Sequence, residues 1–204
     1  MALIYVMDPM CSWCYAFQPH LRELISRLKP GIKILCYMGG LAPDSDKPMP
    51  DELQQAIART WHDIEERTDA QFNHEFWQKC QPRRSTYPAC RAVISAELIS
   101  TGSGMLMAEA IQRAYYREAR NPSDLSVLAE LAEEVGLSPK RFTNQMYGEK
   151  TAQILFEDLS YCQDQGIQGY PFLGLETPKG LSVICAGYCG QDQLLQRCSS
   201  LQLI

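Results

Sequence analysis

The sequence predicts an α/β fold in which a β-α-β unit and a β-β-α unit enclose a large all-helical insertion. Three observations predict it. Within residues 1–43, two apolar runs flank one helical period, which is typical of a strand–helix–strand unit with parallel strands. Every periodic segment between residues 51 and 162 repeats at helical spacing. A strand–turn–strand pattern and one more helical period end the chain. We therefore expect one domain built from residues 1–43 and 163–204, and a helical insertion domain at residues 44–162.

The first unit begins with the short apolar run Leu3–Val6, which we interpret as a buried strand. A helical period follows from about Cys11 to Leu28. Pro19 lies within it and predicts a kink, because proline removes one hydrogen bond of the helical ladder. Ile32–Met38 is the second predicted strand. Strand, helix and strand in this order form a right-handed crossover.

The middle of the chain contains only helical patterns. The predicted helices are Asp51–Arg67, Asn73–Lys79, Ala89–Ser100, Met105–Arg120, Ser123–Val135, Pro139–Tyr147 and Glu149–Gln165. Ser138-Pro139 supplies an N-cap and a first-turn proline for one of them. β-structure returns at Gly169–Leu175 and Leu181–Ala186, with a tight turn between them, and the last helix covers about Gly190 to Leu201.

Composition limits the function classes. The 204 residues carry a net charge of −5 without a basic run, so binding to nucleic acid is not expected. No stretch approaches the roughly 18 apolar residues of a membrane span, and the first residues do not resemble an export signal, so we expect a cytoplasmic location. Nine cysteines is a high count, and most should remain reduced there. Five of them lie in apolar context and are interpreted as small buried hydrophobic residues: Cys36, Cys90, Cys162, Cys185 and Cys198.

The pair Cys11 and Cys14 is the strongest chemical signal. It lies where the first strand passes into the first helix, so the free N–H groups and the positive end of the helix dipole can stabilise a thiolate on Cys11. Two cysteines at this spacing also form half of many zinc sites, but such a site needs a second pair. The nearest candidates, Cys185 and Cys189, are predicted at the opposite end of the chain. The βαβ context therefore favours a redox pair, and no metal site is predicted.

Three motifs carry a family resemblance: Asp8-Pro9-Met10-Cys11-Ser12-Trp13-Cys14, Tyr87-Pro88-Ala89-Cys90-Arg91-Ala92 and Gly169-Tyr170-Pro171-Phe172. With them the chain resembles the DsbA-like thioredoxin-fold family, in particular its cytoplasmic branch related to FrnE and to 2-hydroxychromene-2-carboxylate isomerase. The resemblance covers nearly the whole chain and implies a thioredoxin fold. It also implies that Pro171 follows a cis peptide bond facing the redox pair, with the Tyr170 backbone beside Cys11. Cys11, Cys14 and Pro171 are the predicted catalytic residues.

The predicted substrate-binding residues are Trp13, Tyr15, Tyr170, Cys90 and Arg91. Trp13 and Tyr15 provide an apolar platform beside the thiols, or else pack against the insertion. Cys90 and Arg91 belong to a segment that covers the active site in the resembled family, although burial of an inert Cys90 is the simpler interpretation. Two further arginines, Arg83 and Arg84, suit a glutathione carboxylate, although a solvated loop pair is the simpler and preferred interpretation. The three histidines, His20, His62 and His74, are interpreted as packing or surface residues.

The leading functional prediction is a dithiol–disulfide oxidoreductase in which Cys11 attacks and Cys14 resolves the mixed disulfide. Since Ser12 and Trp13 carry no charge, we expect a less oxidising pair than in relatives with histidine between the cysteines. One alternative is a glutathione-dependent isomerase or transferase, although such relatives do not retain the second cysteine. Another is a redox-sensing adaptor that binds a protein partner. No cofactor is expected to be required. The expected partners are protein thiols and disulfides or a small thiol such as glutathione.

Overall fold

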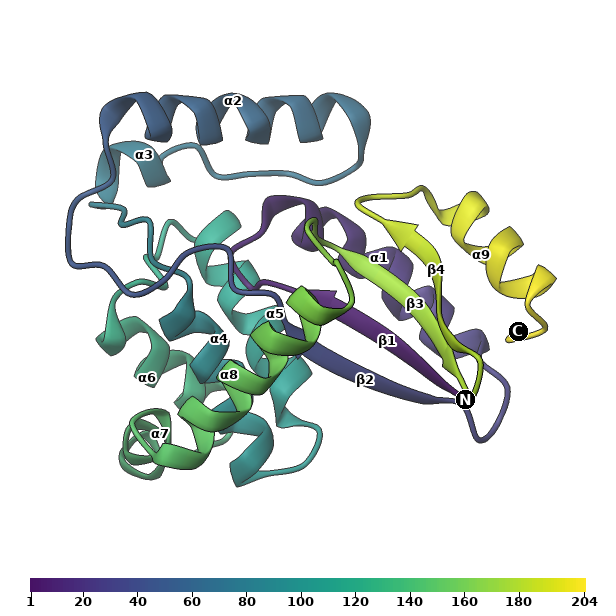
Figure 1. The fold of residues 1–204 in the computed structure, drawn as a ribbon. Coiled ribbons are helices and arrows are strands. Elements are labelled where there is room, and N and C mark those ends of the chain that lie inside the picture. Colours follow the sequence, from purple (N-terminus) through teal and green to yellow (C-terminus); the bar gives the residue numbers. More distant parts are fainter.

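The computed structural model describes all 204 residues and contains one four-stranded sheet in the order β2-β1-β3-β4 (Figure 1). β1 (Ala2–Met7) pairs in parallel with β2 (Lys33–Met38) and antiparallel with β3 (Phe172–Thr177). β4 (Gly180–Ala186) is antiparallel to β3 at the other edge. The parallel pair and the hairpin are those predicted from the sequence. β3 begins later than predicted, at the residue after Pro171.

Nine helices complete the chain. They are α1 (Ser12–Arg27), α2 (Asp51–Arg67), α3 (Phe76–Lys79), α4 (Tyr87–Ile99), α5 (Ser103–Tyr116), α6 (Leu125–Glu134), α7 (Pro139–Met146), α8 (Glu149–Asp164) and α9 (Gln191–Ser200). Each was predicted, with ends that differ by a few residues. No helix of the chain combines the length and the apolar character needed to cross a membrane.

β1 is buried on both faces of the sheet, and its alternating side chains face two different layers. Leu3, Tyr5 and Met7 belong to the main core, which also contains residues of α1 and α9. Ile4 and Val6 belong to a small second core with Cys162 of α8 and Phe172 of β3. Figure 1 accordingly shows α1 behind the sheet and α8 in front of it. This is why the strand is apolar at every position.

The main core of 43 buried residues continues from the sheet into α4, α5, α6 and α7. One core therefore joins the two predicted domains. The predicted boundaries of the insertion domain, at residues 44 and 162, stay predictions. α2 and α3 lie beyond the N-terminal end of α1, across the top of the view in Figure 1. The end of α1 that carries the cysteines thus faces the inserted helices.

One buried carboxyl connects α8 to the sheet and predicts a pH effect on stability. The backbone N–H of Met38 donates to Asp158 Oδ2 at 2.8 Å, and burial raises the pKa of Asp158 from 3.8 to about 7. Because the folded state holds this proton more tightly than the unfolded chain, the stabilisation is complete at acid pH and is lost as pH rises through about 7. The free energy of unfolding should fall by about 2 to 3 kcal/mol between about pH 5 and about pH 8.

Urea unfolding at the two pH values checks this. Asp158→Asn keeps an oxygen that accepts from the Met38 N–H but carries no titrating proton. It should therefore remove this part of the pH dependence of the unfolding free energy. Asp164→Asn, at an exposed position near the end of the same helix, is the control and should keep it. An equal change of the unfolding free energy with pH in wild type and Asp158→Asn would contradict the expectation.

Candidate active site

Cys11 and Cys14 lie at the N-terminus of α1. Cys11 is the N-cap residue, with extended backbone angles, and its N–H donates to the Asp8 carbonyl at 3.0 Å. Cys14 lies in the first turn and is fully buried, whereas Cys11 is 7% exposed. Both are free thiols. The first-turn N–H groups have no partner within the helix and are available to an anion on Cys11.

Tyr170 and Pro171 form the wall opposite Cys11. Their peptide bond is cis, and the Cys11 Sγ lies 3.6 Å from the Tyr170 carbonyl oxygen. The Tyr170 hydroxyl donates to the Gly39 carbonyl at 2.7 Å. A Cβ on Gly39 would lie 2.2 Å from the Tyr170 ring, so only glycine permits this approach. The end of β2 therefore positions Tyr170, and through it the wall beside Cys11.

Asp8 is a fully buried carboxyl directly before the motif. Its Oδ1 accepts from the Met10 N–H at 2.7 Å, and its Oδ2 accepts from the Leu41 N–H at 2.7 Å and the Thr86 hydroxyl at 2.6 Å. Burial raises the pKa of Asp8 against the lowering effect of these hydrogen bonds. The sequence showed Asp8 only as part of the motif. Its position between a buried strand and the first cysteine was the available signal.

The thiol of Cys14 is held in its neutral form. Burial is the main reason why the pKa of Cys14 lies well above its ordinary value, and the neighbouring Cys11 raises it further. Cys90, whose Sγ lies 3.7 Å from Asp8 Oδ2, also has a strongly raised pKa, first because of burial and then because of the Asp8 charge. Cys11 is therefore the accessible thiol of this cluster.

A cavity of about 250 Å³ opens beside Cys11, between α1 and α2. Its wall is mostly apolar and includes Trp13, Tyr170 and, from α2, Ile57. Two of the predicted substrate-binding residues thus lie at the cavity. The apolar lining beside a thiol suits an extended peptide or a small organic thiol.

Arg83 and Arg84 both line this cavity, but their environments differ. Arg83 forms an ion pair with Asp124 and donates to the Ser123 carbonyl at 2.6 Å. Arg84 has no hydrogen-bond or ion-pair partner in the structure. Arg84 is therefore the cation that remains available to an anionic ligand.

The other predicted binding residues lie outside the cavity lining. The Tyr15 ring stacks on Tyr116 at 4.7 Å, which is packing against the insertion. Cys90 is fully buried, as its simpler interpretation expected. Arg91 makes a two-point ion pair with Asp44, at 2.9 and 2.6 Å. Their predicted roles in substrate binding stay predictions.

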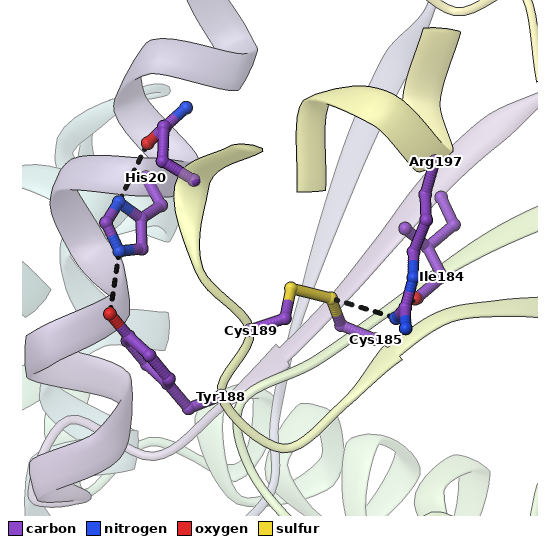
Figure 2. The surroundings of a disulfide bond; sticks show 7 residues. His20, Ile184, Cys185, Tyr188, Cys189 and Arg197 are labelled. Carbon is purple, nitrogen blue, oxygen red and sulfur yellow. Dashed lines mark hydrogen bonds between the residues drawn. A yellow bond between two sulfur atoms is a disulfide. The ribbon is translucent and has the colours of Figure 1, made fainter. Parts of the chain in front are cut away.

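The structure corrects the interpretation of Cys185. Cys185 is buried as expected, but it is not a reduced thiol, because a disulfide joins it to Cys189 and closes a loop between β4 and α9 (Figure 2). The expectation of a buried thiol was also too strong for Cys36, which is only partly buried. The spacing of Cys185 and Cys189 was visible in the sequence, but nothing in it indicated that their sulfur atoms meet.

The structure also brings together side chains that the sequence left separate. Glu65 Oε2 lies 2.9 Å from His74 Nε2 and 3.5 Å from His62 Nδ1, and the two imidazole rings stack at 4.0 Å. Each of these three residues offers one atom of the kind that can bind a metal ion, and the three atoms lie within 4.8 Å of one another. Glu65 Oε1 is already used by the Phe72 N–H, which connects α2 to the following loop. Through Glu65, these contacts fix the loop that follows α2 against that helix.

Comparison with known proteins places this arrangement in a family. A family model described as thioredoxin matches residues 4–175. The curated relatives include the ClpXP adapter protein SpxH of Bacillus subtilis, which is 23% identical over 168 residues. That match covers 82% of this chain and 55% of the relative, so the chain spans about half the length of the curated relatives it matches.

Solved structures match over the full length. A candidate protein disulfide isomerase from Nitrosomonas europaea is 28% identical, with a TM-score of 0.88 and coverage of 98% of this chain and 97% of its own. The cytosolic disulfide reductase DsbM from Pseudomonas aeruginosa is 25% identical, with a TM-score of 0.81 and complete coverage of both chains. The same reductase has been solved with glutathione, at a TM-score of 0.79 to this chain.

These matches confirm the thioredoxin fold with a helical insertion, and they support the predicted enzyme class, a dithiol–disulfide oxidoreductase. The family model covers most of the chain, and the full-length neighbours share both the sheet and the inserted helices. The chain belongs to the thioredoxin family.

Proposed function

We propose that this protein is a cytoplasmic thiol–disulfide oxidoreductase that reduces disulfides through Cys11 and Cys14. The Cys11 thiolate attacks a substrate disulfide, forms a mixed disulfide and releases one substrate thiolate. Cys14 then loses its proton and attacks the Cys11 sulfur, which releases the second substrate thiolate and leaves a Cys11–Cys14 disulfide. The observation that carries this proposal is the position of Cys11, at the helix N-terminus, 3.6 Å from the Tyr170 carbonyl and beside a cavity.

The environment of the pair favours reduction of the substrate over its oxidation. A pair is strongly oxidising when its reduced form is stabilised as a thiolate. Here neither residue between the cysteines is charged, and burial holds Cys14 as a neutral thiol. Electrons therefore leave the reduced pair more readily than in a strong oxidant. The name of the similar Pseudomonas protein, a cytosolic disulfide reductase, agrees with this direction and with a cytoplasmic location.

Glutathione is the small-molecule thiol that the cavity suits best. Its carboxylates need a cation, and Arg84 is the arginine of the cavity wall without an internal partner. Its cysteine must reach Cys11, and the Tyr170 carbonyl offers an acceptor beside that sulfur. The similar reductase solved with glutathione supports this choice.

A second candidate is a redox-sensing adaptor. Its supporting observation is the similarity to the SpxH proteins, which are named as adapters. The same dithiol would then report redox state to a bound partner. The glutathione-dependent isomerase is less well supported, because the resolving Cys14 is present and buried directly behind Cys11.

The test is reduction of a glutathionylated peptide, coupled to glutathione reductase, together with the equilibrium potential of the pair in glutathione buffers. We expect turnover and a potential nearer to about −270 mV than to about −120 mV. Arg84→Gln should raise the KM for the peptide several-fold, whereas Arg83→Gln is the matched control and should change it less. A potential near −120 mV would overturn the reductive direction. Absence of any exchange by wild type would leave the adaptor as the better proposal.

A further inference from the structure

The loop closed by the Cys185–Cys189 disulfide touches the active site from two sides. Its Gly187 N–H donates to the Pro171 carbonyl at 2.8 Å, so it is bonded to the wall opposite Cys11. Its Tyr188 ring lies 5.4 Å from the ring of Trp13, the residue directly before Cys14. The loop is therefore part of the surroundings of the catalytic pair, although it follows the last strand.

The loop is also attached to α1 by hydrogen bonds. The Tyr188 hydroxyl lies 2.8 Å from His20 Nε2, and His20 Nδ1 lies 2.7 Å from Gln191 Oε1 (Figure 2). Tyr188 and Gln191 flank the disulfide-bonded Cys189 in the sequence. Cys189 therefore lies between two residues that are both bonded to His20 of α1.

A disulfide over so short a loop stabilises the fold less than one that closes a longer loop. The two cysteines are separated by four positions, and the chain entropy that a cross-link removes grows with the length of the loop it closes. Local attachment of Tyr188 is a better account of this bond than stabilisation of the whole fold.

The sulfur atoms of this pair differ in a way that suits thiol attack. Cys189 is 6% exposed, close to the 7% of Cys11, whereas Cys185 is 1% exposed. Arg197 Nη1 lies 3.8 Å from the Cys185 Sγ (Figure 2). A guanidinium at this place stabilises a thiolate that leaves from Cys185.

We propose that Cys185 and Cys189 are a second redox site, which a small-molecule thiol of the glutathione class opens and closes, and which positions Tyr188 against Trp13. One thiolate attacks the Cys189 sulfur and displaces Cys185 as a thiolate. A second thiolate attacks the sulfur of the small molecule in the mixed disulfide. The products are two cysteine thiols, protonated from water, and one small-molecule disulfide, so two electrons pass from two thiols to the bond. The reverse sequence closes it.

Trypsin provides a direct assay, because it separates the two pairs. The peptide 180–197 contains Cys185 and Cys189 and no other cysteine, and the peptide 1–22 contains only Cys11 and Cys14. The full-length protein is equilibrated in glutathione buffers of graded ratio, alkylated, digested and weighed by mass spectrometry. We expect peptide 180–197 to change from disulfide to dialkylated dithiol while circular dichroism shows that the protein stays folded.

The same assay can overturn the proposal in two ways. The pair is structural if the disulfide persists until the protein unfolds. No second redox site exists if peptide 180–197 remains a dithiol in fully oxidised glutathione. Neither result depends on exchange at Cys11 and Cys14, so failure here is distinct from failure of the proposed function.

The contact with Trp13 is tested on Cys14→Ser, which leaves Cys11 as the only thiol of the catalytic pair. Adding Cys185→Ala and Cys189→Ala should raise the rate of Cys11 alkylation by iodoacetamide about two- to tenfold, the factor that corresponds to loss of one aromatic contact. Adding Cys198→Ala instead removes a nearby buried free thiol and is the control. Equal alkylation rates in all three proteins would show that the loop does not position Tyr188 at the site.

Discussion

Replacement of Cys11 by serine is expected to abolish thiol–disulfide exchange, with a loss of about three orders of magnitude or more. The reaction begins with a thiolate, and a serine hydroxyl neither ionises near neutral pH nor forms a disulfide. The neighbouring thiols Cys14 and Cys90 cannot take over, because both are fully buried and burial holds both as neutral thiols. The measurement is the initial rate of reduction of the glutathionylated peptide.

Cys14→Ser provides the contrasting variant. Cys11 can still attack, but the mixed disulfide lacks its internal resolving thiol and should accumulate. Mass spectrometry of the peptide 1–22 should then find one glutathione on Cys11. Cys198→Ala, which removes a buried thiol on α9, should retain the wild-type rate. Residual activity in Cys11→Ser close to that of wild type would place the nucleophile elsewhere.

The fold was predictable from the sequence because local signals and tertiary packing agree. β1 is apolar at every position since both of its faces are covered, and the helices of the insertion have regular apolar periods. The predicted ends of α2 and the predicted start of α7 coincide with the observed ones. The ends of strands that depend on the backbone groups of a single residue were less predictable. β3 begins only after Pro171, which has no N–H to contribute to a strand ladder.

The surroundings of the cysteines were only partly predictable. Cys11 and Cys14 could be identified because their spacing and their place at a helix start are local properties. The approach of Tyr170 came from a family resemblance. The contacts of Asp8, Tyr188 and the Cys185–Cys189 pair depend on which distant segments meet, and no local pattern encodes that. The ion pair of Arg91 with Asp44 likewise joins residues that lie far apart in the sequence, and no local pattern indicates it.

The buried carboxylate of Asp8 is expected to be the polar group whose loss costs most. Asp8→Ala leaves the Met10 and Leu41 N–H groups and the Thr86 hydroxyl without their acceptor. An unsatisfied buried donor costs about 1 to 3 kcal/mol, so the free energy of unfolding should fall by about 3 to 6 kcal/mol. Urea unfolding followed by circular dichroism measures it.

Asp8→Asn separates hydrogen bonding from charge. An amide has a single acceptor oxygen, so its NH₂ group must face either Met10 or Leu41, and one backbone donor loses its partner. The loss should be about 1 to 3 kcal/mol, smaller than in Asp8→Ala.

The negative charge disappears in both variants, and that charge contributes to the raised pKa of Cys14 and Cys90. Alkylation of Cys14 and Cys90 in folded Asp8→Asn should therefore begin at lower pH than in wild type. If Asp8→Asn is as unstable as Asp8→Ala, the negative charge of Asp8, rather than the number of its acceptor oxygens, stabilises the segment between β1 and α1. If its alkylation profile is unchanged, Asp8 supports the backbone around the cysteines without influencing their ionisation.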